Sequence, residues 1–68
     1  MPIIEVNMVE GRTTAQKRAM VAAITDGVVS TLGVPADSVR VIIREMHAEH
    51  FVVGGLSKAA VAEQNGKP

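Results

Sequence analysis

The sequence predicts an α+β fold, in which a β-α-β unit with parallel strands is followed by a short C-terminal hairpin. Three observations predict it: apolar residues alternate over 3–9, recur at helical spacing up to residue 32, and are β-branched over 38–46. A chain of 68 residues is one domain, 1–68, in which we expect about 56–68 to form a weakly determined tail.

The first strand is predicted at Ile3–Val9, because successive side chains alternate between two faces. One face consists of Ile4, Val6 and Met8, and the other of Ile3, Glu5, Asn7 and Val9. Gly11 ends the strand.

A long helix is predicted next, and Thr13 with Gln16 fits a capping box at its start. Gly33 and Pro35 end it. Gly27 lowers the helix propensity by about 1 kcal/mol relative to alanine, and close packing on the apolar side of the helix is the explanation we expect. The apolar residues at helical spacing are Met20, Val21, Ile24, Val28 and Leu32.

The second strand is predicted at Ser38–Met46, where Val39, Val41 and Ile43 share one face and Arg40, Ile42 and Arg44 share the other. A strand, a helix and a strand form a right-handed crossover, which makes the two strands parallel. One helix covers only one face of the sheet. The exposed face and strand edges therefore predict a homo-oligomer.

The C-terminal part carries weaker signals. The segment His50–Leu56 contains the pair Gly54-Gly55 and predicts a small hairpin or turn. We expect the last four residues, 65–68, to be a frayed terminus.

The composition excludes several classes of function. Seven basic residues balance seven acidic ones, so we expect no nucleic acid and no membrane as partner. Cysteine is absent, which excludes disulfides and thiolate metal sites. The N-terminal segment has no basic region, and Glu5 interrupts its apolar stretch too early for a signal peptide. We therefore expect a cytoplasmic protein.

Pro2 is the most informative residue, because removal of Met1 would make its ring nitrogen the free α-amino group of the chain. Methionine aminopeptidases accept small second residues, proline among them. An α-amino group has a pKa near ~7.7–8.0, so modest help from cations or burial leaves it neutral and able to take a proton. The alternative is a proline that only shields the terminus.

Arg12 follows the Gly11 turn, and Arg40 lies in an otherwise aliphatic strand, where a guanidinium needs a partner or an opening to water. Two such groups across a pocket would hold both ends of a dicarboxylate. The alternatives are a solvated loop cation for Arg12 and an intersubunit ion pair for Arg40. His47 and His50 lack a third ligand, so we expect surface histidines and no metal site.

These residues converge on a family. Pro2 opens the first strand, and the following segments come in order: Val9–Arg12, Ser38–Ile43, Glu45–Met46, His50–Phe51 and Gly54–Gly55. From Pro2 to about Gly55 the chain closely resembles the 4-oxalocrotonate tautomerase family of small-subunit tautomerases. The resemblance implies a tautomerase/MIF-like fold and a homohexamer, a trimer of dimers whose active sites are shared between subunits.

The resemblance also implies the site. Pro2 would be the general base and then acid, Arg40 would bind the carboxylate beside the 2-hydroxy or 2-oxo group, and Arg12 would bind the far carboxylate. Phe51 would form an apolar wall. Val9 and Ser38 match positions that line the pocket. No metal or organic cofactor is needed.

The implied activity is an isomerase that ketonises 2-hydroxymuconate-type dienols to the conjugated 2-oxo acid, as in aromatic hydrocarbon catabolism. One alternative is a relative acting on another 2-oxo acid, by tautomerising an aryl pyruvate enol, by hydration or in biosynthesis. The other is a non-catalytic oligomeric module. Arg44 adds a cation, which would either alter which acid fits or pair with Glu45 or a neighbouring chain.

Overall fold

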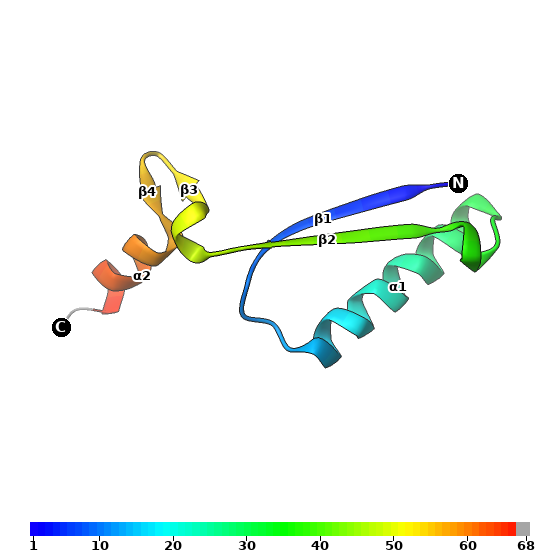
Figure 1. Ribbon diagram of the computed structural model, residues 1–68, viewed down its shortest axis with the longest axis horizontal. Coiled ribbons are helices and arrows are strands. Elements are labelled where there is room, and N and C mark those ends of the chain that lie inside the picture. The colour runs from blue at the N-terminus through cyan, green and yellow to red at the C-terminus, as the bar shows by residue number, and fades with distance from the viewer. Residues whose placement is uncertain (67–68) are drawn as a thin grey trace.

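The chain folds around a two-stranded parallel sheet with one long helix beside it (Figure 1), as the sequence predicts. The computed structural model describes residues 1–66. Its elements in order are β1 (Ile3–Val9), α1 (Thr14–Leu32), η1 (Ala36–Ser38), β2 (Arg40–Met46), η2 (Ala48–His50), β3 (Val52–Val53), β4 (Leu56–Ser57) and α2 (Lys58–Gly66).

The register of the parallel sheet runs from Ile3 opposite Arg40 to Val9 opposite Met46. Backbone hydrogen bonds extend the ladder at both ends. The Arg40 N–H donates to the Pro2 carbonyl at 3.0 Å, and the Glu10 N–H donates to the Met46 carbonyl at 2.8 Å. Both strands therefore start at the Pro2 end and finish at the same far end.

The boundaries of α1 match the predicted signals. The Gln16 N–H donates to the Thr13 hydroxyl at 3.1 Å, and the Thr13 N–H donates to the Gln16 side-chain carbonyl at 3.0 Å, which completes the capping box. Gly33 ends the helix in the left-handed conformation, with φ of 68°. Gly27 is exposed, and no described atom lies within 4 Å of where its Cβ would be. Close packing within the chain does not explain Gly27.

The predicted start of the second strand is wrong by two residues. Ser38 ends the short η1 turn instead, and its hydroxyl donates to the Pro35 carbonyl at 2.8 Å. A serine hydroxyl that bonds its own backbone three residues back favours a turn over an extended strand. The strand begins at Arg40.

The hairpin predicted within His50–Leu56 is confirmed, and it extends one residue further, to Ser57. It consists of β3 and β4, antiparallel and joined at Gly54 and Gly55, which have φ of 62° and 84°. Two consecutive positive φ angles are what a tight hairpin turn requires, and glycine adopts them without strain.

The segment 56–68, for which the sequence predicts a weakly determined tail, begins with β4 and continues as a helix. Residues 58–66 form α2, because the Ala-rich segment favours a helix and the Ser57 hydroxyl accepts the Ala60 N–H at 3.0 Å as an N-terminal cap. Of the predicted frayed terminus, residues 65–66 belong to α2. Residues 67–68 lie outside the described part of the chain.

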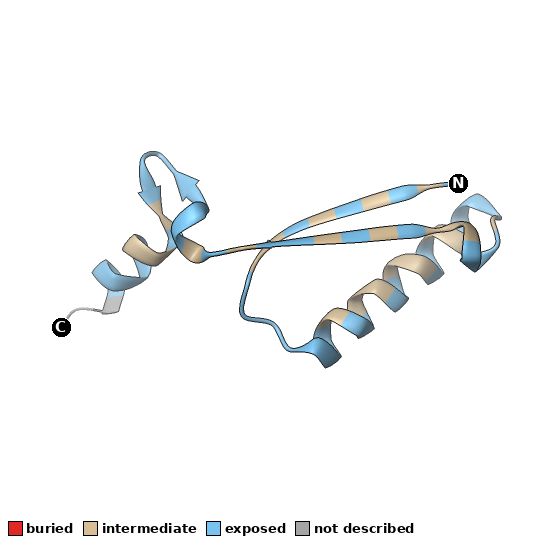
Figure 2. Cartoon of the chain, in the orientation of Figure 1, coloured by how far each residue is buried: buried red, intermediate tan, exposed pale blue. Residues whose placement is uncertain are grey.

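None of the residues 1–65 is fully buried, as Figure 2 shows. On the face of the sheet that α1 leaves open, Ile3 and Ile42 expose 56% and 42% of their surface. The Cα radius of gyration is 16.1 Å. A compact domain of this length would have a radius of about 11 Å. Residues 1–65 of a single chain thus form no buried core. No helix within residues 1–66 has the length and apolar character needed to cross a membrane.

Candidate active site

Pro2 lies at the start of the parallel ladder, next to Arg40 in the backbone. Met1 precedes it and exposes 77% of its surface. The Pro2 carbonyl, and not its nitrogen, carries the hydrogen bond to Arg40. Removal of Met1 would therefore leave this end of the ladder intact.

The side chains of Pro2 and Arg40 do not meet within one chain. Strand alternation puts the Pro2 ring on the side of Ile4, which faces α1, and the Arg40 side chain on the opposite face. Arg40 is exposed, and its guanidinium donates to the Asp37 carbonyl at 2.5 Å. Ser38 lies at the same end, with its hydroxyl already bonded to Pro35.

Val9, Arg12 and Phe51 lie at the opposite end of the sheet. Seven strand residues at a rise of about 3.3 Å separate the two ends by roughly 20 Å. The predicted site residues therefore form two groups, and one chain does not bring them together around a single small molecule.

Val9 and Arg12 line one open hollow of ≈ 310 Å³, which we call the Arg12 hollow. Phe51, exposed to 46%, lines a separate hollow of ≈ 190 Å³, the Phe51 hollow, together with Val53 and Leu56. Lys58 lines both hollows, and its backbone N–H donates to the Phe51 carbonyl at 2.8 Å. The full lining of the Arg12 hollow is Val9, Glu10, Gly11, Arg12, Ala48, Lys58, Ala59 and Ala62.

Lys58 is the residue beside the predicted site that the sequence reasoning missed. Its position depends on the hairpin, which folds the start of α2 back toward the loop before α1. The available signal was Ser57, whose type and position mark the beginning of a helix.

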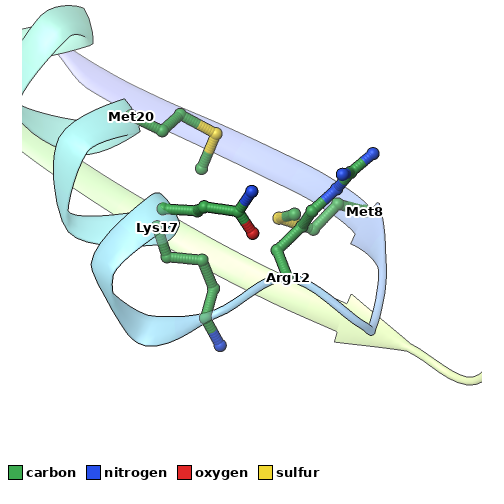
Figure 3. Close-up of a pocket in the computed structure, with 5 residues that line it drawn as sticks. Met8, Arg12, Lys17 and Met20 are labelled. Atoms are coloured by element: carbon green, nitrogen blue, oxygen red, sulfur yellow. The ribbon is translucent and has the colours of Figure 1, made fainter.

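Arg12 also borders a hollow of ≈ 250 Å³ between β1 and α1, lined by Met8 and Met20 (Figure 3). In this view the Arg12 guanidinium points away from the Lys17 amine. Among the described residues, no carboxylate forms an ion pair with Arg12 or Arg40. Both cations thus lack an acidic partner within the described part of the chain.

Arg44 pairs with Glu5 on the open face of the sheet, with Nη1 3.1 Å from Oε2 and Nη2 3.3 Å from Oε1. The hydrogen bond and then the charge of Glu5 raise the pKa of Arg44 above its ordinary value. The suggested pairing of Arg44 with Glu45 is wrong, because Glu45 pairs with Lys17 at 2.6 Å on the α1 side.

His47 and His50 are exposed, with ring centroids 5.8 Å apart. The His47 Nδ1 accepts the Glu49 N–H at 3.1 Å, and its Nε2 lies 4.0 Å from a Glu10 oxygen. Residues 1–66 contain no group of three or more side chains that could hold a metal ion. Both histidines lie on the surface of the single chain.

Comparison with known proteins decides the family. A family profile described as "Tautomerase enzyme" matches residues 2–61. The chain belongs to the tautomerase family. This tautomerase is 50% identical to a solved structure from a study of the 4-oxalocrotonate tautomerase isozymes of Methylibium petroleiphilum, with a TM-score of 0.84 over 97% of this chain and 100% of that one.

Two curated relatives of this tautomerase are informative. A probable tautomerase of Ralstonia nicotianae is 48% identical over 93% of this chain and 90% of its own length. A 2-hydroxymuconate tautomerase of Stutzerimonas stutzeri is 39% identical over 90% of this chain and 97% of its own length. The resemblance expected from the sequence is thereby confirmed at the level of the family and fold.

Proposed function

We propose that this tautomerase ketonises 2-hydroxymuconate-type dienols to the conjugated 2-oxo acid, with Pro2 as general base and acid and without a cofactor. The position of Pro2 carries the proposal. It stands at the start of β1 behind an exposed Met1, and its nitrogen takes no part in the ladder. Cleavage after Met1 would free a secondary amine without cost to the sheet.

The proposed reaction moves one proton. The neutral Pro2 amine takes the proton of the 2-hydroxyl group, the oxygen forms a carbonyl, and the conjugated double bonds shift. The protonated amine then gives the proton to a distant carbon of the dienol. In the proposed assembly, guanidinium groups from neighbouring copies and a poorly solvated site would disfavour the protonated amine, so that it acts as a base near neutral pH.

Arg40 and Arg12 are proposed to bind the two carboxylates of the substrate, because planar guanidinium groups match carboxylates and neither has an acidic partner in the described chain. Arg40 would also stabilise the developing dienolate oxygen. Phe51 is proposed as the apolar wall, and Val9 and Ser38 as lining. Lys58 adds a second cation to the hollow of Arg12.

We propose that other copies of the chain complete the site. The separation of Pro2 from Arg12 and Phe51 by the length of the sheet supports a site shared between subunits. The absence of fully buried residues over 1–65 supports assembly as well. We propose the homohexamer that the sequence resemblance implies. We also propose that the protein acts in the cytoplasm, in the catabolism of aromatic compounds.

The test is ketonisation of 2-hydroxymuconate, followed by ultraviolet absorbance after mass spectrometry has shown that Met1 is absent. We expect Pro2→Ala to lower kcat about 10²-fold or more, the usual contribution of a positioned acid-base group. A preparation of the wild-type sequence that retains Met1 serves as a second probe. In that protein the Pro2 nitrogen is part of an amide and has no useful basicity, so the protein should be inactive. Full activity of either protein would remove Pro2 from the mechanism.

A further inference from the structure

The face of the sheet that α1 leaves open carries an ion pair that the proposed reaction does not use. Glu5 of β1 and Arg44 of β2 lie diagonally across the two strands, since Glu5 is opposite Ile42 and Arg44 is opposite Asn7. Their side chains remain 50% and 56% exposed. Exposed Ile3 and Ile42 belong to the same face.

We propose that Glu5 and Arg44 select which chains assemble across this face, the occupant of the face being a second copy of the same chain. The inference rests on the assembly in the proposed function and goes beyond it. In the assembled protein, each charge of the pair would face the opposite charge of the neighbouring copy.

Charge complementarity argues for a second copy as the occupant. The pair presents one negative and one positive group side by side, so its charges sum to zero. Consider a two-fold axis that lies in the plane of the interface, perpendicular to the line from Glu5 to Arg44 and through its midpoint. This axis would place each Glu5 over the Arg44 of the other copy. Isoleucines on the same face supply the apolar contact area.

The energetic effect of the Glu5–Arg44 pair depends on whether the face is covered. An exposed ion pair contributes little to stability because water solvates both charges. Once the face is covered, an unmatched charge loses its water, and like charges placed together repel each other. A copy with the same charges therefore fits, and a related chain with a different pattern is rejected.

The other ion pair of the sheet gives a matched control. Lys17 and Glu45 lie at 2.6 Å on the α1 side, and their side chains are 25% and 32% exposed. This pair joins α1 to β2 within one chain and does not lie on the open face. Reversing it should leave the choice of partner unchanged.

The experiment mixes the wild-type protein with the double variant Glu5→Arg/Arg44→Glu, which keeps an ion pair of reversed direction. The two proteins are unfolded together and refolded, and native mass spectrometry counts the mixed oligomers. We expect mixed oligomers at least about tenfold below the statistical proportion, since 1.4 kcal/mol already corresponds to tenfold. Lys17→Glu/Glu45→Lys should mix with the wild type statistically. Statistical mixing of the Glu5/Arg44 reversal would overturn the proposal.

A neutral variant, Glu5→Gln/Arg44→Gln, covers the case in which the reversed protein does not refold. We expect it to mix with the wild type more readily than the reversed protein would, and to lose any dependence of mixed assembly on salt. Complete sorting of the neutral variant from the wild type would show that shape, not charge, selects partners.

The 2-hydroxymuconate assay of unmixed wild type separates the two proposals. If the reversed variant mixes statistically with a fully active wild type, only the proposed charge selection is overturned. If the two proteins sort but the wild type is inactive, only the proposed tautomerase activity is overturned.

Discussion

The two arginines of the proposed site differ in what surrounds them. Arg40 is held by a backbone carbonyl at the Pro2 end, whereas Arg12 borders two hollows at the far end and has Lys58 nearby. In the proposed site, Arg40 would act on the group that every substrate shares. Arg12 would act on the part of the substrate that varies.

The role of Arg12 can be tested with two classes of substrate. We expect Arg12→Ala to lower kcat/KM about 10- to 100-fold for a dicarboxylate enol, because a hydrogen bond to a charged group is worth about 1.5–3 kcal/mol. A monocarboxylate enol, such as that of an aryl pyruvate, should change by less than about threefold, since it offers Arg12 nothing to bind.

Arg18→Ala is the control, because it removes an exposed cation of α1 that lines neither the Arg12 hollow nor the Phe51 hollow. It should leave both rates unchanged. Equal slowing of the two substrate classes by Arg12→Ala would contradict the assignment and favour a structural role.

Helix α1 contains one glycine, Gly27, and ends at a second, Gly33, and the two differ in backbone conformation. Gly33 has φ of 68°, where L side chains are strained, and Gly27 does not have a positive φ. Neither has a described atom within 4 Å of the point where an added Cβ would lie, so clashes with neighbours do not complicate the comparison.

Opposite signs are therefore expected for the same substitution. Gly33→Ala should lower the free energy of unfolding by about 1–2 kcal/mol, because the left-handed conformation clashes with a Cβ. Gly27→Ala should raise it by about 0.5–1 kcal/mol, because alanine loses less backbone entropy in a helix. Urea unfolding at one fixed protein concentration measures both. A loss of stability in Gly27→Ala would show that another chain packs against this position.

The chain is long and thin, with extents of 51 × 24 × 16 Å. Its C-terminal hairpin and α2 extend beyond the far end of the sheet (Figure 1). The hairpin contacts η2 and α2 but leaves Val53 exposed to 70%. Such a shape buries too little apolar surface to be stable alone, and assembly is the remaining way to bury it.

The stability of the protein should therefore depend on its concentration. We expect the melting temperature to rise as the protein is concentrated, because association couples to folding by mass action. Sedimentation at high concentration should give six times the chain mass of 7.2 kDa. A monomer with a melting temperature independent of concentration would contradict the shared site and the assembly together.

The local elements follow from the order of the residues alone. Alternation predicts Ile3–Val9, the Thr13 and Gln16 pair predicts the start of α1, and Gly33 predicts its end, because each signal depends on a few neighbouring residues. Local signals are ambiguous at Ser38, where a turn competes with the strand, and weak over 58–66, where the cap at Ser57 marks the start of α2.

The distribution of the functional residues depends instead on how distant segments pair. Glu5 and Arg44 are 39 positions apart in the chain, and their contact exists because the parallel register aligns β1 with β2. The same register places Arg12 and Phe51 a strand's length from Pro2. Periodicity states which face a residue occupies, but the partners and ends of a sheet come from pairing in three dimensions, which no local pattern encodes.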